Sequence, residues 1–400
     1  MTAIMRPVRE RAHRGRRRPR RPRSQSRRDI HGRERRAWCI VSVARAAQGS
    51  SAVDQSVQTQ GASELETERL VLFTEGDDGP SCGLDAAIIR QSGGTLRCVT
   101  AGNQAERLRM AQAAEVLVIN QVPITREFLG GLPRLKGVVR SGIGVDTVDL
   151  DAASDFGVAV ANVPDFCREE VAEHALGLIF AVARKIAQAD RLVRRGGWYE
   201  GVSAEMLPMR QLSGQTLGII GLGRIGQNMA RKAQALGLQV IGHDPQVAAA
   251  AVESAGIRWL PFDDVLRQAD IVSFHVPGSP ATRHLINART LALMKPHAIL
   301  INTARGQVVD ELALEAALAA GHLAGAGLDV LEQEPPRLPH PLFKFENVVF
   351  TCHHASCSIE AYARLCREMS EQAGEILRGE LPRHLVNIRV KDLAQCRVRK

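Results

Sequence analysis

Short apolar runs alternate with longer segments of mixed polarity from about residue 70 to the C-terminal region. Continuous short runs rich in valine and isoleucine are typical of strands that are buried on both faces of a sheet. When such strands alternate with helix-length segments, they predict a parallel sheet with helices on both faces. In the first half of the chain the expected strands occupy residues 70–74, 96–99, 116–119, 137–139 and 158–160.

The same alternation restarts near Thr216 and predicts a second sheet. Two longer segments, residues 169–185 and 359–377, are predicted helices because each carries an apolar stripe at helical spacing. The pattern therefore predicts an α/β protein with two doubly wound parallel-sheet domains. The expected strands of the second sheet lie around Leu217, Ile219 and Ile220 and at residues 239–241, 271–274, 298–302 and 325–328.

A glycine-rich motif, Gly221-Leu-Gly-Arg-Ile-Gly226, falls where the first strand of the second sheet gives way to a helix. The spacing alone is a weak signal, since glycine clusters also form ordinary loops. The context strengthens it, because a helical segment follows, then an apolar run at residues 238–242, then Asp244 about 20 residues after the glycines. Together these features predict a dinucleotide-binding turn.

Each residue of this motif has a physical role in binding a dinucleotide. Gly221 can make the tight turn, and Gly223 lets backbone N–H groups approach a pyrophosphate at the positive end of the helix dipole. Asp244 can accept hydrogen bonds from a ribose 2′-hydroxyl, whereas its charge would repel a 2′-phosphate. The motif therefore predicts NAD rather than NADP.

Length and composition agree with a two-domain α/β protein: 400 residues, 45% apolar and only 4% aromatic. No apolar run approaches the length of a membrane span. The charge is concentrated in residues 1–50, which hold sixteen arginines, no lysine and three acids, a net +13 against +9 for the whole chain. The other 350 residues are therefore mildly acidic, at −4, and have no obvious nucleic-acid footprint.

The arginine-rich segment is expected to be a disordered tail over residues 1–66, because it has too little apolar surface to offset its ordering entropy. Three explanations for it stay open. The chain has been read from too early a start, which we rank first; the tail is an organelle-targeting peptide; or it is a basic arm that binds nucleic acid or a membrane surface.

The eight cysteines are scattered, with no C-x-x-C pair. Neither a disulfide framework nor a zinc cluster is expected from this spacing, and a cytoplasmic location follows as a prediction.

Three candidate catalytic side chains follow three expected strands of the second sheet. Arg305 has the planar, permanently charged group that orients a carboxylate, although a surface ion pair would also explain it. His353 can exchange a proton with a hydroxyl or carbonyl oxygen, and Glu334 can hold its tautomer. Taken singly, His353 would more often be structural and Glu334 a solvated acid. Their shared position at the strand ends predicts one site.

These motifs resemble, over about residues 70–387, the D-isomer-specific 2-hydroxyacid dehydrogenases, a family that includes phosphoglycerate, glycerate, formate and D-lactate dehydrogenases and the C-terminal-binding-protein corepressors. The resemblance rests on the glycine motif with Asp244 and on four further segments in order, namely Leu293-Met-Lys-Pro296, Asn302-Thr-Ala-Arg-Gly306, Gly327-Leu-Asp-Val-Leu-Glu-Gln-Glu-Pro335 and His340-Pro-Leu before Thr351-x-His353. It implies a flavodoxin-like substrate domain at residues 67–166 and 356–390 and a Rossmann NAD-binding domain at 167–355.

The resemblance also implies individual roles. Arg305 would hold the substrate carboxylate and carbonyl, His353 would be the acid/base, and Glu334 would support it. Asp329 would bond the nicotinamide carboxamide. The remaining implied contacts are Gly226, Arg224 and Ile225 at the pyrophosphate turn, Thr303 and Ala304 beside the nicotinamide ribose, and Ser141, Gly142 and Ile143 in the loop whose N–H groups bind the substrate carboxylate.

The chain departs from the family pattern around the histidine. Cys352 stands where the family usually has proline, and His354 follows directly, so two imidazoles compete for the catalytic role. The spacing from Thr351 favours His353. A zinc site at Cys352, Cys357 and the two histidines is the weaker interpretation, and no metal is predicted.

The leading hypothesis is an NAD-dependent D-2-hydroxyacid dehydrogenase that transfers a hydride between nicotinamide and the 2-carbon of a small acid. The alternative is an NAD-sensing, corepressor-like scaffold with little turnover, because residues 166–174 are most similar to the corepressor-related branch. A nucleic-acid-binding protein acting through the tail is a third class. The resemblance further implies a homodimer, whereas the particular hydroxyacid and the direction stay open.

Overall fold

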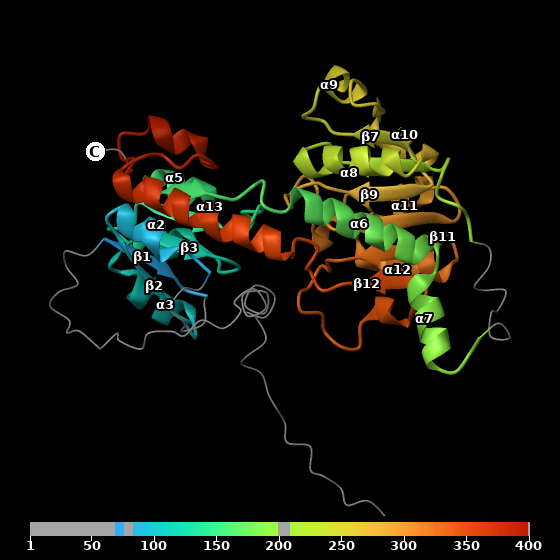
Figure 1. Ribbon diagram of the computed structural model, residues 1–400, viewed down its shortest axis with the longest axis horizontal. Helices are drawn as coiled ribbons and strands as arrows, with labels where there is room; N and C mark the ends of the chain where they lie inside the picture. The colour runs from blue at the N-terminus through green and yellow to red at the C-terminus, as the bar shows by residue number, and fades with distance from the viewer. Residues whose placement is uncertain (1–68, 76–82, 199–208, 399–400) are drawn as a thin grey trace, which may run out of the picture. The chain divides into compact units, whose positions relative to one another are not determined.

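The computed structural model describes residues 69–75, 83–198 and 209–398. The predicted tail, residues 1–66, lies outside them. The described strands form two sheets, and every strand pairs with its neighbours in parallel (Figure 1). Two parallel-sheet units are what the alternation of strands and helices predicted.

The first sheet has five strands in the order β2-β1-β3-β4-β5. This order reverses direction between β1 and β3, as in flavodoxin-like folds. Its strands are β1 (Leu70–Phe73), β2 (Thr95–Cys98), β3 (Ala114–Ile119), β4 (Gly137–Arg140) and β5 (Ala159–Ala161), and its helices are α2 (Ala86–Gln91), α3 (Gln104–Ala111), α4 (Arg126–Gly130), α5 (Leu150–Asp155) and α13 (Ile359–Arg378).

The second sheet has seven strands in the order β12-β11-β10-β9-β6-β7-β8. The order reverses at β6 and β9, which is the Rossmann arrangement with one added strand at β12. Its strands are β6 (Thr216–Ile220), β7 (Gln239–His243), β8 (Arg258–Trp259), β9 (Ile271–Phe274), β10 (Ala298–Asn302), β11 (Leu323–Leu328) and β12 (Val348–Phe350). The associated helices are α6 (Arg168–Ala183), α7 (Ile186–Arg194), α8 (Arg224–Ala235), α9 (Ala249–Glu253), α10 (Phe262–Gln268), α11 (Ala288–Leu293) and α12 (Glu311–Ala319).

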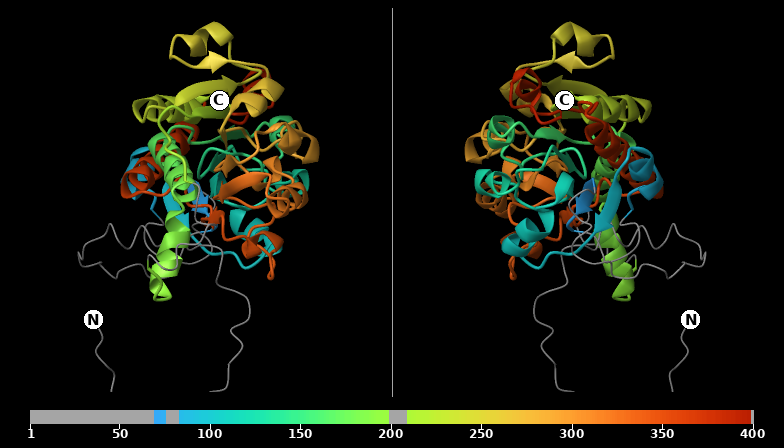
Figure 2. Two further views of the ribbon diagram at one scale, coloured as in Figure 1. Left: turned by 90° about the vertical axis from the view of Figure 1, so that its right-hand side faces the viewer. Right: turned by 90° about the vertical axis from the view of Figure 1, so that its left-hand side faces the viewer.

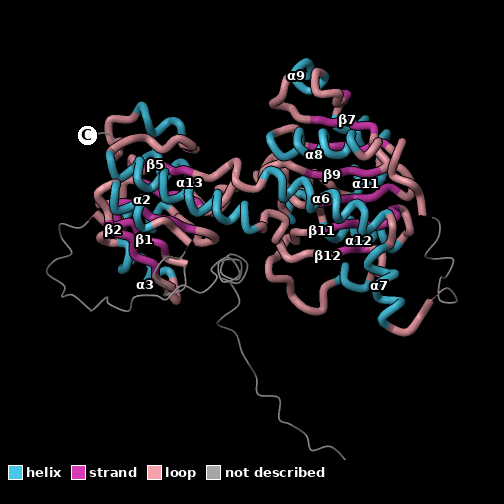
Figure 3. Tube along the Cα trace, viewed as in Figure 1, coloured by secondary structure: helices cyan, strands magenta, loops and turns pink. Residues whose placement is uncertain are grey.

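Each sheet is covered on both faces by apolar side chains, as the continuous apolar runs require. In β3 all six residues are buried, and in β10 all five are. Alternate residues of the central strands contribute to different core clusters, one on each face of the sheet. Figure 3 shows the helices in cyan beside the magenta strands.

Two long helices cross between the sheets. Helix α6 follows the first sheet in sequence but packs against the second, and α13 follows the second sheet but packs against the first. Helix α6 packs against α8, β10 and β11, and α13 packs against α2, β3 and β4 (Figure 1). The chain therefore passes from the first sheet to the second just before Arg168 and returns near Ser358, whose hydroxyl caps α13. The domain bounds expected at residues 166 and 356 stay a prediction.

Most predicted strands lie within a residue or two of the observed ones, but two short edge strands, β8 and β12, have too few residues to give a pattern. The predicted helix at 169–185 is shorter than expected, because Lys185 has a left-handed backbone (φ 51°) that ends α6 and starts α7. No helix of the described residues is long and apolar enough to cross a membrane.

The cysteine prediction needs one correction. Cys98 is disulfide-bonded, whereas Cys167, Cys352, Cys357, Cys366 and Cys396 are free thiols. Spacing along the chain did not show this, because pairing depends on the distance between side chains in the fold.

Candidate active site

Three neighbouring strands of the second sheet, β10, β11 and β12, end at the same edge of the sheet. The carboxyl ends of parallel strands meet at one edge, so the residues that follow them share one region. Arg305 follows β10, Glu334 lies in the loop after β11, and His353 lies in the loop after β12. The fold thus brings the three predicted catalytic loops together.

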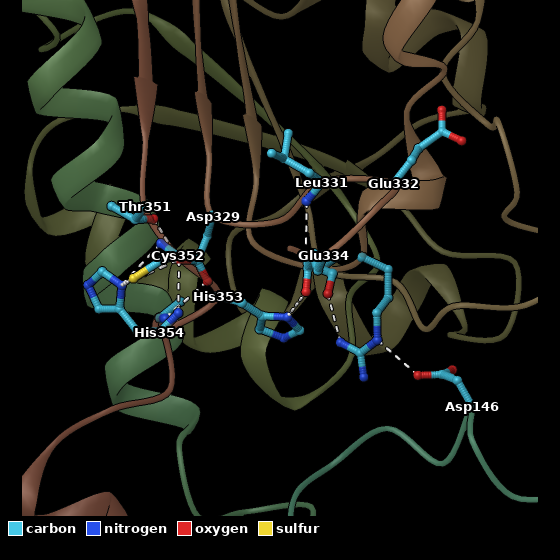
Figure 4. A network of polar contacts seen from close by, with 12 residues as sticks. Asp146, Asp329, Leu331, Glu332, Glu334, Thr351, Cys352, His353 and His354 are labelled. Carbon is cyan, nitrogen blue, oxygen red and sulfur yellow. Dashed lines mark hydrogen bonds and ion pairs between the residues drawn. The ribbon is translucent and has the colours of Figure 1, made fainter. Parts of the chain in front are cut away.

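His353 and Glu334 form a direct pair. The Nδ1 atom of His353 lies 2.6 Å from Oε2 of Glu334, and the two side chains are 40% and 36% exposed (Figure 4). The other oxygen, Oε1, accepts the backbone N–H of Leu331 at 3.0 Å and so holds the carboxylate in place. For the Nε2 atom of His353 no partner is recorded among the described residues, so this nitrogen is available to a ligand.

The loop that carries His353 is anchored by a buried carboxylate, Asp329, whose side chain is 1% exposed. Its Oδ1 accepts the hydroxyl of Thr351 at 2.5 Å and the N–H of His354 at 3.1 Å, while Oδ2 accepts the N–H of Ala355 at 3.0 Å (Figure 4). The carbonyl of Asp329 accepts the N–H of His353 at 2.7 Å. These four bonds hold His353 in a left-handed backbone conformation (φ 54°).

The neighbouring imidazole, His354, points elsewhere. Its Nδ1 lies 3.3 Å from both the N–H and the Sγ of Cys352, and its ring meets that of His174 edge-on at 4.9 Å. His174 in turn bonds the Thr351 hydroxyl through Nε2 at 2.9 Å, and burial lowers the pKa of His174. Of the two adjacent histidines, His353 is the one that pairs with Glu334.

Arg305 makes an ion pair with Asp146, which lies in the loop after β4 of the first sheet. Its Nε donates to Oδ2 of Asp146 at 2.9 Å, and its Nη1 donates to the carbonyl of Ala304 at 2.7 Å (Figure 4 shows Asp146). The loop after β4 therefore lies against the guanidinium: a Cβ added at Gly144 would come within 1.8 Å of Nη2. Arg305 and the predicted substrate loop are thus neighbours.

Only some of the backbone N–H groups of the predicted substrate loop are available to bind a ligand. The N–H of Ser141 donates to the Ile119 carbonyl at 2.7 Å, and that of Gly142 donates to the Arg140 carbonyl at 2.9 Å. Within the described part of the chain, no acceptor is recorded for the N–H groups of Ile143 and Gly144. An incoming carboxylate would therefore meet Ile143 and Gly144 rather than Ser141 and Gly142.

The glycine turn has the geometry that a dinucleotide needs. Gly221 has a positive φ of 95°, and a Cβ at Gly226 would lie 2.0 Å from the Gly221 carbonyl oxygen, so both positions require glycine. A Cβ at Gly223 would meet no described atom within 4 Å, so open space lies in front of it. Gly223 is also the N-cap of α8, and no side chain caps these N–H groups. A pyrophosphate fits this helix end.

Two further side chains support the fit of the cofactor. The carboxylate of Asp244, just after β7, accepts the N–H of Leu222 at 2.8 Å and that of Gln246 at 2.8 Å, which keeps it beside the turn. The hydroxyl of Thr303 is buried without a partner among the described residues, as expected of a group that a ligand would bond. Ala304, next to it, is 8% exposed.

The side chains of three other predicted cofactor contacts, Arg224, Ile225 and Asp329, have protein partners in this structure. The side chain of Arg224 pairs with Asp165 at 3.3 Å, and that of Ile225 packs against a core cluster of the first sheet. Only their backbone groups therefore face the turn. Asp329 is surrounded by the bonds of the histidine loop, so its main role in this structure is to organise that loop. Over the described ranges, no group of three or more His, Cys, Asp or Glu could hold a metal ion.

Two residues of the site were missed by the sequence interpretation. The sequence analysis assigns no role to Asp146 or to His174, which lies within the predicted helix at 169–185. Neither has a local signal, because each acquires its role from a partner more than a hundred residues away, Arg305 for Asp146 and Thr351 for His174.

The fold and site define a class: two-domain α/β proteins in which a Rossmann sheet with a dinucleotide turn presents a His–Glu pair and an arginine at its strand ends. Comparison with known proteins agrees. Residues 176–355 match the family model for the "D-isomer specific 2-hydroxyacid dehydrogenase, NAD binding domain".

Curated relatives and solved structures extend the match to most of the chain. It is 38% identical over 310 residues to D-3-phosphoglycerate dehydrogenase of Methanocaldococcus jannaschii, covering 76% of this chain and 57% of that protein. It is 39% identical over 282 residues to glyoxylate reductase of Korarchaeum cryptofilum, covering 70% and 84%. The structure of D-lactate dehydrogenase from Aquifex aeolicus with NAD and lactic acid has a TM-score of 0.68 at 29% identity, covering 78% and 96%.

The chain belongs to the D-isomer-specific 2-hydroxyacid dehydrogenase family. It spans little more than half the length of the phosphoglycerate dehydrogenases that it matches. The family, the fold class and the NAD-binding domain predicted from the sequence are confirmed, and the relatives favour the dehydrogenase hypothesis over the NAD-sensing scaffold.

Proposed function

We propose that the protein is an NAD-dependent oxidoreductase that interconverts a small D-2-hydroxyacid and its 2-keto acid. One observation carries this proposal: the 2.6 Å pair between His353 and Glu334 leaves Nε2 of the imidazole without a described partner, beside the loop that presents Arg305. The relatives named above act on such acids by their names, D-3-phosphoglycerate, glyoxylate and D-lactate.

The residues of the chain divide the work as follows. A bound nicotinamide would supply the hydride chemistry. Arg305 binds the carboxylate and the carbonyl oxygen of the keto acid and stabilises the negative charge that develops on that oxygen. His353 donates a proton from Nε2 to the same oxygen, and Glu334, bonded to Nδ1, fixes the tautomer and stabilises the protonated ring. In the oxidation direction the same groups act in reverse.

Residues of the second domain would hold the cofactor: Gly221, Gly223 and Gly226 at the pyrophosphate, Asp244 at the adenosine ribose, and Thr303 with Ala304 at the nicotinamide ribose. The unpartnered hydroxyl of Thr303 and the open space at Gly223 support these assignments. The Asp244 carboxylate disfavours a 2′-phosphate, so we expect NADH to be preferred over NADPH.

The direct test is oxidation of NADH, followed at 340 nm, with a panel of glyoxylate, pyruvate and 3-phosphohydroxypyruvate. We expect at least one substrate to be consumed, and His353→Ala to abolish the reaction. Consumption by the wild type that is no faster than by His353→Ala would overturn the proposal and favour the NAD-sensing scaffold.

The surface of α7 supports a homodimer. None of its residues is buried, the helix projects from the second sheet in Figures 1 and 2, and Ile186 and Val193 are 53% and 47% exposed, with Trp198 beyond it at 62%. Exposed apolar groups so close together favour association with a second copy. Light scattering of the wild type and of Val193→Asp tests this, since a dimer that survives the charge would argue against this surface.

The cytoplasmic location and any binding of nucleic acid by residues 1–66 stay predictions. Cell fractionation tests the first. Salt-dependent DNA binding that is lost on removal of residues 1–66 tests the second.

A further inference from the structure

Within the described ranges, the recorded partners of Arg305 use only two of the five N–H groups of its guanidinium. Its Nε donates to Asp146 and its Nη1 donates to the Ala304 carbonyl. No further acceptor is recorded among the described residues for the second N–H of Nη1 or for the two of Nη2. Those remaining donors lie on adjacent nitrogens, which is the arrangement that grips a carboxylate with two bonds. Asp146 thus occupies the Nε side of the guanidinium, and donors without a described partner remain on Nη1 and Nη2.

The contact between Arg305 and Asp146 is built into the backbone on both sides. A Cβ at Gly144 would lie 1.8 Å from Nη2 of Arg305 and 2.8 Å from Oδ2 of Asp146. A Cβ at Gly278 would lie 3.0 Å from Cγ of Arg305 and 3.1 Å from Oδ1 of Asp146. The ion pair therefore lies between two glycines, one from the loop after β4 and one from the loop after β9, where side chains would crowd it.

The charges around the pair also require Asp146. Arg140, at the end of β4, is a second guanidinium close by, and its pKa is lowered to about 10, first by burial and then by the positive charge of Arg305. The Asp146 carboxylate acts in the opposite direction on Arg140. Without it, two like charges would face one another across the loop, and Arg305 would be free to turn toward solvent.

We propose that Asp146 is a positioning residue that holds the Nε side of Arg305 and so aims its Nη groups at the substrate carboxylate. This inference rests on the proposed function. The pair is about a third exposed, at 27% and 34%, so its contribution to folding stability is small and its effect lies in orientation. Because the carboxylate and the guanidinium come from the loops of different sheets, the same contact also brings the substrate loop to Arg305.

The test compares Asp146→Asn and Asp146→Ala with the wild type and with Asp151→Asn. Asp151 is five residues away, its side chain is 89% exposed, and its recorded ion pair is with Arg389, so it is a charge-matched control. Binding of oxamate, an unreactive keto-acid analogue, to the NADH complex is measured by calorimetry, together with kcat and KM for the substrate found above.

We expect Asp146→Ala to weaken oxamate binding by about 100-fold, because the Arg305 guanidinium would no longer be held in the orientation that binds the carboxylate. Asp146→Asn should weaken it by about tenfold, because the amide oxygen still accepts from Nε but without charge. KM should rise and kcat fall together, while the Kd of NADH and the behaviour of Asp151→Asn stay within twofold of the wild type. A purely structural defect would instead lower the active fraction at constant KM.

The proposal is overturned if Asp146→Ala binds oxamate within twofold of the wild type. Crystal structures of Asp146→Asn and Asp146→Ala give an answer that does not depend on activity: a guanidinium whose Nη groups keep their wild-type direction in the alanine variant as well as in the asparagine variant would also overturn it. If the wild type reduces no keto acid, the proposed function fails, and the orientation of Arg305 in these crystals still decides the role of Asp146.

Discussion

The glycine turn at residues 221–226 and the histidine loop at residues 351–355 both follow strands of the second sheet, but they are stabilised in different ways. The turn depends on the absence of side chains, at Gly221 and Gly226, in a short stretch of chain. The histidine loop depends on side chains that come from distant elements, with Asp329 and His174 holding Thr351. The turn that we propose for a dinucleotide is encoded locally, whereas the orientation of the proposed catalytic imidazole requires long-range partners.

The largest effect is expected when the two adjacent histidines are replaced one at a time. His353→Gln removes the imidazole that Glu334 holds, so kcat should fall by about 10³-fold, in the range of a lost general acid. His354→Gln removes a ring that contacts Cys352 and His174, and activity should stay within about tenfold. Steady-state assays of both variants decide this. Equal losses would mean that the loop acts as one unit and that the pairing seen here does not select the acid.

A smaller effect is expected in the glycine turn. Gly226→Ala would place a methyl group 2.0 Å from the Gly221 carbonyl oxygen, and we expect a loss of about 2–3 kcal/mol in the free energy of unfolding. Urea denaturation measures it.

The matched control is Gly223→Ala, whose Cβ meets no described atom within 4 Å. It should leave stability unchanged and weaken NADH binding, because the added methyl group occupies the space proposed for the pyrophosphate. Wild-type NADH affinity in this variant would argue against that placement of the cofactor.

The long-range anchoring of the histidine loop is tested by Thr351→Val. The change removes the hydroxyl that donates to Asp329 and that bonds His174, so we expect a loss of about 1–2 kcal/mol in stability. Because His353 is carried by the same loop, kcat should fall by about tenfold. Thr351→Ser keeps the hydroxyl and should retain both properties. Similar losses in the valine and serine variants would show that packing of the methyl group, rather than the hydrogen bonds, matters.

The smallest effect concerns His275, which follows β9 beside the glycine turn and whose N–H donates to the Ile220 carbonyl at 2.8 Å. Burial lowers the pKa of His275 to about 4, below the ordinary value of 6.5. Between pH 6.5 and pH 4 the His275 imidazole is protonated in the unfolded chain but neutral in the folded one. Its contribution to the free energy of unfolding is therefore complete above pH 6.5 and is lost as the pH falls toward 4. The residue keeps some exposure to solvent, so we expect about 1 kcal/mol rather than the full effect of the shift.

Urea unfolding of the wild type and of His275→Asn at pH 7 and pH 4.5 measures this contribution. The difference in stability between the two proteins should shift against the wild type at the lower pH. A difference that does not depend on pH would show that His275 is not kept neutral by the fold.

Sequence patterns were sufficient for features that arise within a few residues. The alternation of apolar runs predicted two parallel sheets, and Gly221 and Gly226 marked the tight turn between a strand and a helix, because glycine conformations and strand-end positions are local properties. The order of Arg305, Glu334 and His353 along the chain predicted that their loops meet, since neighbouring parallel strands end at one edge. The edge strands β8 and β12 gave too short a signal.

The partners of Asp146, His174 and Asp329 could be found only from the tertiary structure. Asp146 meets Arg305 from the other sheet, and Asp329 turned out to organise the histidine loop, for which no local pattern exists. The choice between His353 and His354 likewise depended on which ring reaches Glu334. The physical reason is that hydrogen bonds and ion pairs act over a few ångströms, so partners far apart in the chain become neighbours only when both sheets have folded.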